Sequence, residues 1–138
     1  MADRVRKASY CYLTVANRAG QGAKILEAIK KAEINLLAYS GFPLKGGKAQ
    51  LDLITGNMAS LRRLAKKQDW RMSKLKKGFV IQGKDDIGAV HRHIQKLADA
   101  KISVTAADAV SAGKGRYGMI LWVKPKDYAR AARVLKAK

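Results

Sequence analysis

The sequence of this chain matches itself when it is shifted by 68 residues, with no gap in either copy. The shift also pairs apolar residues of one class, such as Leu26 with Ile94. Because the register never slips, we predict two homologous units of about 60 residues, residues 1–74 and residues 75–138. The identical pairs are Gly20 and Gly88, Ala32 and Ala100, Ile34 and Ile102, Ala38 and Ala106, Gly47 and Gly115, Leu53 and Leu121, and Arg62 and Arg130.

The apolar pattern predicts the order strand, helix, strand, strand, helix in each unit. In the first unit these elements are expected at residues 11–15, 20–32, 33–39 and 50–55, with a hairpin turn at 43–47. Asn57 is expected to cap the last helix, which carries Leu61 and Leu64, and residues 71–73 are expected to form a short fourth strand. Cys11 and Trp70 are expected to be buried.

The second unit repeats this plan. Strands are expected at residues 79–81, 102–110 and 117–123, with a turn at 111–116, and Pro125 suits the first turn of a last helix. Ile87, Val90, Ile94 and Leu97 are spaced as one face of a helix. No residues remain for a fourth strand. The predicted fold is therefore α+β, with two ferredoxin-like βαββαβ units that have helices on one face of an antiparallel sheet, the second unit lacking its last strand.

Two equivalent loops, residues 17–22 and 84–88, are the expected sites of chemistry. The start of a helix offers unpaired backbone N–H groups, and glycine allows a carboxylate to approach them closely. An Asn or Asp just before the glycine can accept a hydrogen bond from a ligand ammonium group, so the pair suits a zwitterion. Asn, Asp and Gly are also ordinary capping and turn residues. The recurrence of Gly20 and Gly88 at the same place favours the ligand-binding interpretation.

The second unit resembles an ACT domain in residues 85–88, 97–104, 115–123 and 131–135, and residues 17–20 with 32–36 resemble a second copy. ACT domains bind amino acids or related metabolites where domains pair. Ala19 and Ile87 stand where the family often has proline, and the missing strand implies strand exchange or pairing between copies. The resemblance assigns ligand contacts to Asn17, Arg18, Gly20 and Asn35, and to Asp85, Asp86, Ile87, Gly88 and Ser103.

The sequence therefore predicts a regulatory protein that binds a small metabolite, pairs as a homodimer and is not an enzyme. His91 and His93 are two residues apart on a helix, so they cannot share a metal ion, and neither a cofactor nor a metal is expected. No apolar run reaches the ~20 residues of a membrane span, and the first residues lack the apolar segment of a signal peptide. We therefore expect no membrane association and a cytoplasmic protein.

RNA binding is the alternative function, because the RNA-recognition motif has the same order of elements. The net charge of +19 favours polyanionic partners, including nucleic acid or an acidic protein. Tyr117 on a strand and Phe79 on another would then stack on bases. The basic residues expected to support this function are Arg62, Arg63, Lys66 and Lys67.

Overall fold

The computed structural model describes residues 3–138, which form two compact units. The first unit contains residues 9–76, and the second contains residues 3–8 together with residues 77–138. The elements are β1 (Arg4–Ala16), α1 (Gln21–Lys31), β2 (Ala38–Leu44), β3 (Lys48–Ile54), α2 (Met58–Lys67), β4 (Lys76–Lys84), α3 (Ala89–Asp99), β5 (Val104–Gly113), β6 (Arg116–Val123), a 3-10 turn (Pro125–Asp127) and α4 (Tyr128–Leu135). Their strands follow the hydrogen-bonded order β2-β3-β1-β4-β6-β5.

The first unit packs its two helices on one face of three strands. β3 lies between β1 and β2 and is antiparallel to both, with Tyr10 opposite Ile54 and Ala38 also opposite Ile54. Asn57 caps α2 as predicted, since its side chain accepts from the amide of Ser60 at 3.3 Å. The buried core, against which Trp70 packs, consists of Leu13, Ile29, Ile34, Leu53, Leu61 and Leu64.

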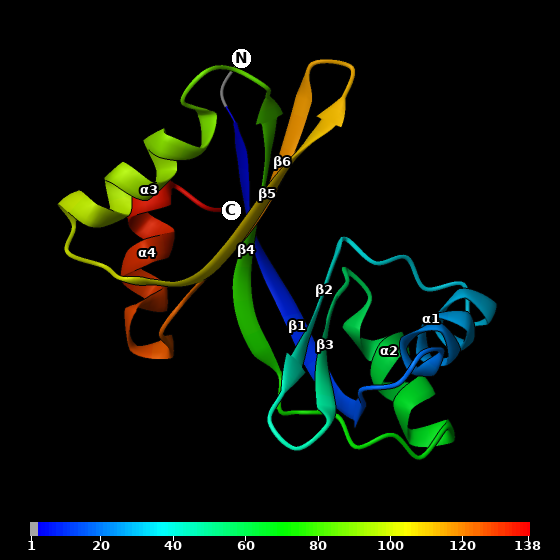
Figure 1. Ribbon diagram of the computed structural model, residues 1–138. Helices are drawn as coiled ribbons and strands as arrows, with labels where there is room; N and C mark the ends of the chain where they lie inside the picture. Colours follow the sequence, from blue (N-terminus) through cyan, green and yellow to red (C-terminus); the bar gives the residue numbers. More distant parts are fainter. Residues whose placement is uncertain (1–2) are drawn as a thin grey trace. The chain divides into compact units, whose positions relative to one another are not determined.

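The second unit has the same plan. β6 lies between β4 and β5 and is antiparallel to both. Helices α3 and α4 lie side by side over one face of these strands (Figure 1). Pro125 begins the turn that leads into α4, as its missing N–H predicts. Phe79, Leu97, Leu121 and Ala131 are fully buried in this core. Two ferredoxin-like α+β units are thus confirmed.

The N-terminal part of β1 completes the second unit. A βαββαβ unit places its last strand beside its first, and in the second unit this place, next to β4, is taken by residues 4–8. Val5 is buried in the core of this unit, and the amide of Lys138 donates to its carbonyl at 3.1 Å. The amide of Lys7 donates in turn to the carbonyl of Lys138 at 3.0 Å. The strand missing from the second repeat therefore comes from the beginning of the same chain.

The division of the chain differs accordingly from the predicted boundary between residues 74 and 75. Residues 3–8 lie with the second unit, although the repeat assigned them to the first. The short strand expected at residues 71–73 does not form. Ser73 nevertheless lies beside Tyr12 and makes two hydrogen bonds with it, both at 2.9 Å. The amide of Ser73 donates to the Tyr12 carbonyl, and the Tyr12 amide donates to the Ser73 hydroxyl instead of to the Ser73 carbonyl. A side chain thus replaces the backbone acceptor that would extend a strand ladder.

Two local predictions were wrong in detail. The second strand was expected at residues 33–39 but begins at Ala38, because Glu33 has the left-handed φ of +57° and Ile34 enters the core. This strand continues through Pro43, which an edge strand tolerates since the proline needs no hydrogen-bond partner. Ile87 was expected on the buried face of a helix, but it precedes the helix and is fully exposed.

The longest helices, α1 and α3, have 11 residues each. Within residues 3–138, no helix has the length and apolar character of a membrane span.

Candidate functional site

The two predicted loops have the same backbone hydrogen bonds. The amide of Asn17 donates to the carbonyl of Gly47 at 2.8 Å, and the equivalent amide of Asp85 donates to the carbonyl of Gly115 at 2.9 Å. Three further backbone hydrogen bonds repeat at the same offset. In the first loop the amides of Arg18, Gln21 and Lys24 donate to the carbonyls of Ala16, Arg18 and Gly20, respectively. In the second loop the amides of Asp86, Ala89 and Arg92 donate to the carbonyls of Lys84, Asp86 and Gly88. The repeat therefore extends to the geometry of the loops.

Each loop ends in a glycine at the N-cap position of the following helix. Gly20 precedes α1 with φ +89°, and Gly88 precedes α3 with φ +80°, a left-handed conformation that favours glycine. Neither helix start has a side-chain capping hydrogen bond. A Cβ atom added at either glycine would have no atom within 4 Å. The space in front of both helix starts is open, so a ligand can approach the backbone there.

A cleft lies at each loop, between the start of the helix and the edge strand. The cleft of the second unit has a volume of about 250 Å³, and that of the first unit about 320 Å³. Equivalent residues line both: Asn17 and Asp85, Arg18 and Asp86, Gln21 and Ala89, Gly22 and Val90, Gly41 and Ala109, Phe42 and Val110, Pro43 and Ser111, and Ala49 and Tyr117.

The cleft of the second unit carries two carboxylates. The hydroxyl of Ser111, on edge strand β5, donates to Asp85 Oδ2 at 2.7 Å and so orients this carboxylate. Asp86 lies 3.7 Å from the ammonium group of Lys84, with both side chains exposed. This cleft presents negative charge on a strongly basic protein, which suits a ligand with a cationic group beside its anionic end.

The cleft of the first unit differs in charge and in shape. Asn17 and Arg18 replace the two aspartates, so its polar lining is neutral and positive. The hydroxyl of Tyr39 lies close to both Gly22 and Gly41, at 3.4 and 3.3 Å from the positions that a Cβ atom would occupy. The equivalent residue in the second unit is Ala107, and the tyrosine that lines the second cleft, Tyr117, comes from β6 instead. The two clefts therefore have the same backbone geometry, but their side chains suit different ligands.

Most of the site residues expected from the sequence lie together at these loops, but two do not. Asn35 precedes β2 at the far end from Asn17, and its carbonyl accepts from Thr55 Oγ1 at 2.7 Å. Ser103 is exposed just before β5, at the equivalent place. Neither residue lines the cleft of its unit. Ile87 and Gly20 belong to the loops but also stay outside the lining of the second and the first cleft, respectively.

The sequence patterns did not indicate the residues that the edge strands contribute to the clefts. Val110 and Ser111 on β5 line one cleft, and Tyr39 and Phe42 on β2 line the other. The signal that finds them is the position of each hairpin, because the turn brings the end of the edge strand next to the loop after the first strand. The tip at Gly115 accepts from Asp85, and the tip at Gly47 accepts from Asn17.

A buried carboxylate, Asp3, contacts Tyr117, which lines the second cleft. The Asp3 side chain, 3% exposed, accepts from the Tyr117 hydroxyl at 2.5 Å and from His93 Nε2 at 2.6 Å. It also accepts from Arg92 at 3.1 Å. Burial raises the pKa of Asp3, but the hydrogen bonds from these three partners outweigh burial, so this pKa lies below its ordinary value. Because Tyr117 also lines the cleft, Asp3 joins the N-terminal strand to the site.

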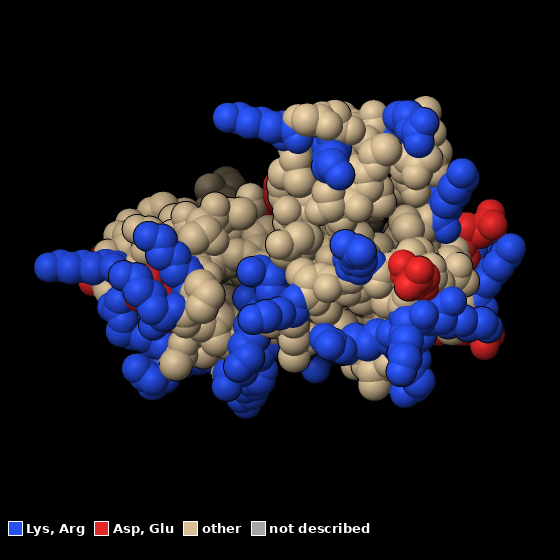
Figure 2. Space-filling model, turned by 90° about the horizontal axis from the view of Figure 1, so that it is seen from below, with Lys and Arg blue, Asp and Glu red and all other residues tan. Residues whose placement is uncertain are grey.

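Phe79 and Tyr117, the two rings that the RNA alternative would use, are both buried. Phe79 is fully buried and stacks on Tyr128, with ring centroids 4.6 Å apart. Tyr117 is buried with its hydroxyl on Asp3. Both rings belong to the core of the unit, and Tyr117 also lines the second cleft. The basic side chains Arg62, Arg63, Lys66 and Lys67 are exposed as expected, and Figure 2 shows a face on which Lys and Arg far outnumber Asp and Glu.

The thiol and imidazole groups form no metal site. In the part of the chain that the structure describes, no three His, Cys, Asp or Glu side chains are placed to hold a metal ion. His93 is buried on Asp3 and His91 is exposed. Cys11 is fully buried in β1, as predicted, and burial raises the pKa of its thiol despite the nearby Arg62.

The fold and the paired loops define a class: this chain consists of two ferredoxin-like α+β units in tandem. Solved structures share the fold over nearly its whole length. Protein BT0572 from Bacteroides thetaiotaomicron superposes with a TM-score of 0.73 at 15% identity, covering 97% of this chain and 88% of that one. A structure of aspartokinase alpha and beta subunits gives 0.61 at 16% identity, covering 98% and 95%. The ligand-free regulatory subunit of aspartate kinase from Thermus thermophilus gives 0.60 at 12% identity, covering 98% and 93%.

At these identities the likeness is one of fold. No protein-family model matches the sequence, and no curated protein matches it. Two further neighbours are described as the regulatory subunit of aspartate kinase from Thermus flavus and a C-terminal regulatory domain of aspartate kinase from Porphyromonas gingivalis.

Proposed function

We propose that the chain is a regulatory protein without catalytic activity that binds an amino acid or a closely related metabolite at the cleft of the second unit. The observation that supports this most directly is the open space at Gly88, where the start of α3 has no side-chain cap and lies beside a cleft lined by Asp85 and Asp86. The amides would bind the ligand carboxylate, and Asp85, held by Ser111, would accept from its ammonium group. Two or three charged hydrogen bonds, less the cost of association, correspond to roughly micromolar to millimolar affinity.

A thermal-shift screen of amino acids at millimolar concentration tests this function. We expect one or a few to raise the melting temperature, since a ligand stabilises the state that it binds. Gly88→Ala should remove the shift, because its methyl group would occupy the open space at a left-handed residue. Gly46→Ala is the matched control, with a φ of +80° in the other unit and equal strain. The function is wrong if no amino acid or related metabolite stabilises the protein, or if the Gly46 variant loses the shift as well.

We further propose that two copies pair through the edge strand β5. Ile87, Val90 and Val110 are apolar and exposed beside the second cleft, with 66% of Val110 accessible. An unpaired edge with apolar side chains is a surface for strand pairing. Such pairing would also close the cleft over its ligand.

This pairing predicts a dimer in solution. Sedimentation velocity should give about twice the mass of the chain, and Val110→Lys should give the monomer, because a charge on the edge opposes strand pairing. Phe42→Lys, on the edge strand of the other unit, is the control and should leave the dimer intact. A wild-type monomer at all accessible concentrations would contradict the proposed pairing.

A further inference from the structure

A third concave region lies on the first unit, between α2 and the segment that follows it. We call it the α2 groove. Arg62, Arg63 and Lys66 line it from the helix, and Trp70 and Met72 line it from the segment. Its volume is about 540 Å³, which exceeds that of either loop cleft. It shares no lining residue with either cleft, so it needs an explanation of its own.

Both walls of the α2 groove are held in place by the backbone. The helix ends with a left-handed residue, Asp69 at φ +59°, which turns the chain back. The amide of Trp70 then donates to the carbonyl of Ala65 at 2.8 Å, as in a Schellman motif. Ser73, further along, is fixed on Tyr12 by two hydrogen bonds. A ligand would meet a preformed groove and would lose little affinity to ordering it.

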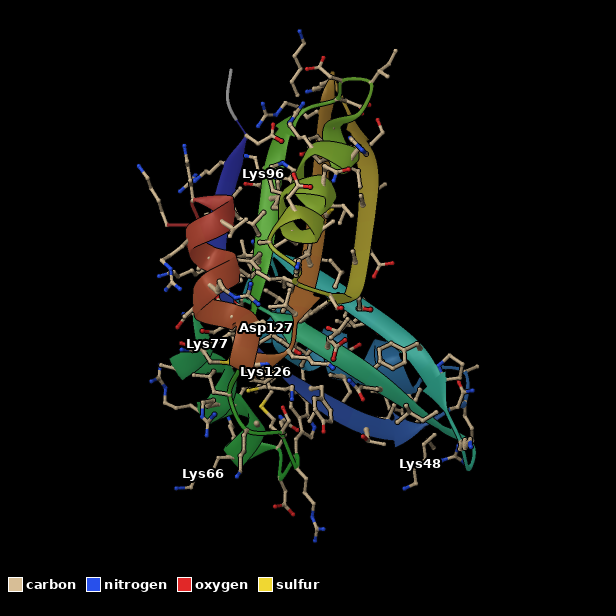
Figure 3. The ribbon with its side chains drawn as sticks, turned by 90° about the vertical axis from the view of Figure 1, so that its left-hand side faces the viewer. Lys48, Lys66, Lys77, Lys96, Lys126 and Asp127 are labelled. Carbon is tan, nitrogen blue, oxygen red and sulfur yellow. The ribbon has the colours of Figure 1, made fainter. Side chains whose placement is uncertain are left out.

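Three cations and one carboxylate, Asp69, line the α2 groove, so its lining carries a net positive charge. Residues 53–76 contain seven Lys or Arg residues and a single acidic residue, Asp69. No ion pair found among residues 3–138 involves any of them. Lys66 is favoured by the negative end of the α2 dipole, and Figure 3 shows it extending away from the helix. Arg62 and Arg63 lie too far from that end to be explained in this way.

Like charges also lie close together on α2. Arg62 and Lys66 are one turn apart on α2, and such like-charged pairs destabilise a helix slightly. Arg63 donates to the hydroxyl of Ser60 at 2.9 Å, and Arg62 reaches the thiol of Cys11 at 4.0 Å. Neither contact neutralises a cation. A bound anion would relieve the repulsion.

The other wall indicates what the anion carries. Trp70 is partly buried against the core with one part accessible to the groove, and Met72 lies in the same wall. An aromatic ring beside cations suits a planar base, which stacks on it. Asp69 would repel a purely anionic ligand, but it can accept from a hydroxyl or amino group. The groove volume lies in the range of roughly 300–1,000 Å³ that small-molecule sites have.

We propose that the α2 groove binds a nucleoside di- or triphosphate, with its phosphates on Arg62, Arg63 and Lys66 and its base against Trp70. Arg62 and Lys66 are ~6 Å apart along the helix axis, which lets them contact successive phosphates. Asp69 accepts from the sugar or the base. The groove thus gives the protein a second ligand, independent of the one proposed for the loop clefts.

Titration with ATP tests the groove through the fluorescence of Trp70. The chain has two tryptophans, so Trp122→Phe leaves Trp70 as the single reporter. We expect saturable quenching by ATP, because a stacked base quenches indole. Arg62→Ala with Arg63→Ala should weaken binding at least ~10-fold, the effect of losing charged hydrogen bonds. Lys66→Ala is an independent single-site version with a smaller loss in the same direction.

The matched control removes the same charge elsewhere. Lys24 and Lys30 are exposed on α1 of the same unit, and their double replacement by alanine should change ATP binding less than ~2-fold. Equal losses in the two double variants would mean a general charge effect and would overturn the proposal. So would tripolyphosphate binding as tightly as ATP, or a short oligouridylate binding more tightly than ATP and with the same dependence on Arg62 and Arg63.

Discussion

Asp3→Ala is expected to lower the free energy of unfolding by about 2–4 kcal/mol. The Asp3 carboxylate is buried and accepts hydrogen bonds from Tyr117, His93 and Arg92. Its removal leaves the tyrosine hydroxyl and the imidazole buried without their acceptor, and such orphaned groups cost about 1–3 kcal/mol each. It also frees the N-terminal strand that completes the second unit. Urea denaturation measured at neutral pH gives the difference.

Asp99→Ala is the control, because Asp99 is exposed and contacts only Gln95, one turn away. It should change stability by less than about 0.5 kcal/mol. The same network predicts the pH dependence of the shape-preserving variant Asp3→Asn. The folded pKa of Asp3 is lowered, so its stabilisation is fully present above the unfolded value of ~4 and is lost as the pH falls through the folded value. A stability gap between wild type and Asp3→Asn that stays constant from pH 7 to the acid limit of folding would contradict this account.

The repeat predicted most of the fold because both copies obey the same backbone constraints. Gly20 and Gly88 mark helix starts with left-handed φ, and the ends of these helices turn at Glu33 and Lys101 with φ +57° and +59°. Glycine is expected in that conformation, but Glu33 and Lys101 are not, so no turn residue in the sequence marks the left-handed turn that follows each helix. After each turn the chain returns to the core, where the equivalent residues Ile34 and Ile102 are buried.

The N-terminal strand was not predictable from local pattern. Residues 4–8 read Arg-Val-Arg-Lys-Ala, in which Val5 is the one large apolar residue. An apolar alternation over such a short segment is too sparse to indicate a strand, and its pairing with β4 joins residues more than 70 positions apart. The absence of a fourth strand in the second repeat was the available signal. It showed that a strand was needed but not which segment supplies it.

The loops of the site were predictable, and the residues facing them were not. Asn17, Gly20, Asp85 and Gly88 occupy positions that a glycine-containing helix start dictates. The opposite wall depends on the register of an edge strand, and a shift of one residue changes which side chains face the cleft. β5 contains one register irregularity between Val104 and Ala106 and a second between Ser111 and Gly113. No pattern in the sequence marks them.

Gly83→Ala is expected to destabilise the second unit by about 1–3 kcal/mol, through the same carboxylate. Gly83 lies on β4 opposite Tyr117, and Asp3 is packed directly against its backbone. An added Cβ would overlap Asp3 Oδ1 and lie 2.6 Å from its Cγ, so Asp3 would have to leave its three partners. Gly118→Ala on the neighbouring strand is the control. Its Cβ would find the nearest atom, the Ile81 carbonyl oxygen, at 4.0 Å, and alanine should be neutral or slightly stabilising there.

The double variant separates this steric explanation from a general intolerance of β4 to side chains. If Asp3 is what the new methyl group displaces, Gly83→Ala should cost almost nothing once Asp3 is alanine. Alanine also loses less backbone entropy than glycine in a strand, so the double variant could equal or exceed Asp3→Ala in stability. Urea denaturation of the four proteins gives the coupling energy. Additive losses would show that Gly83 is required for a reason other than room for the Asp3 carboxylate, and that the N-terminal strand is not held at this point.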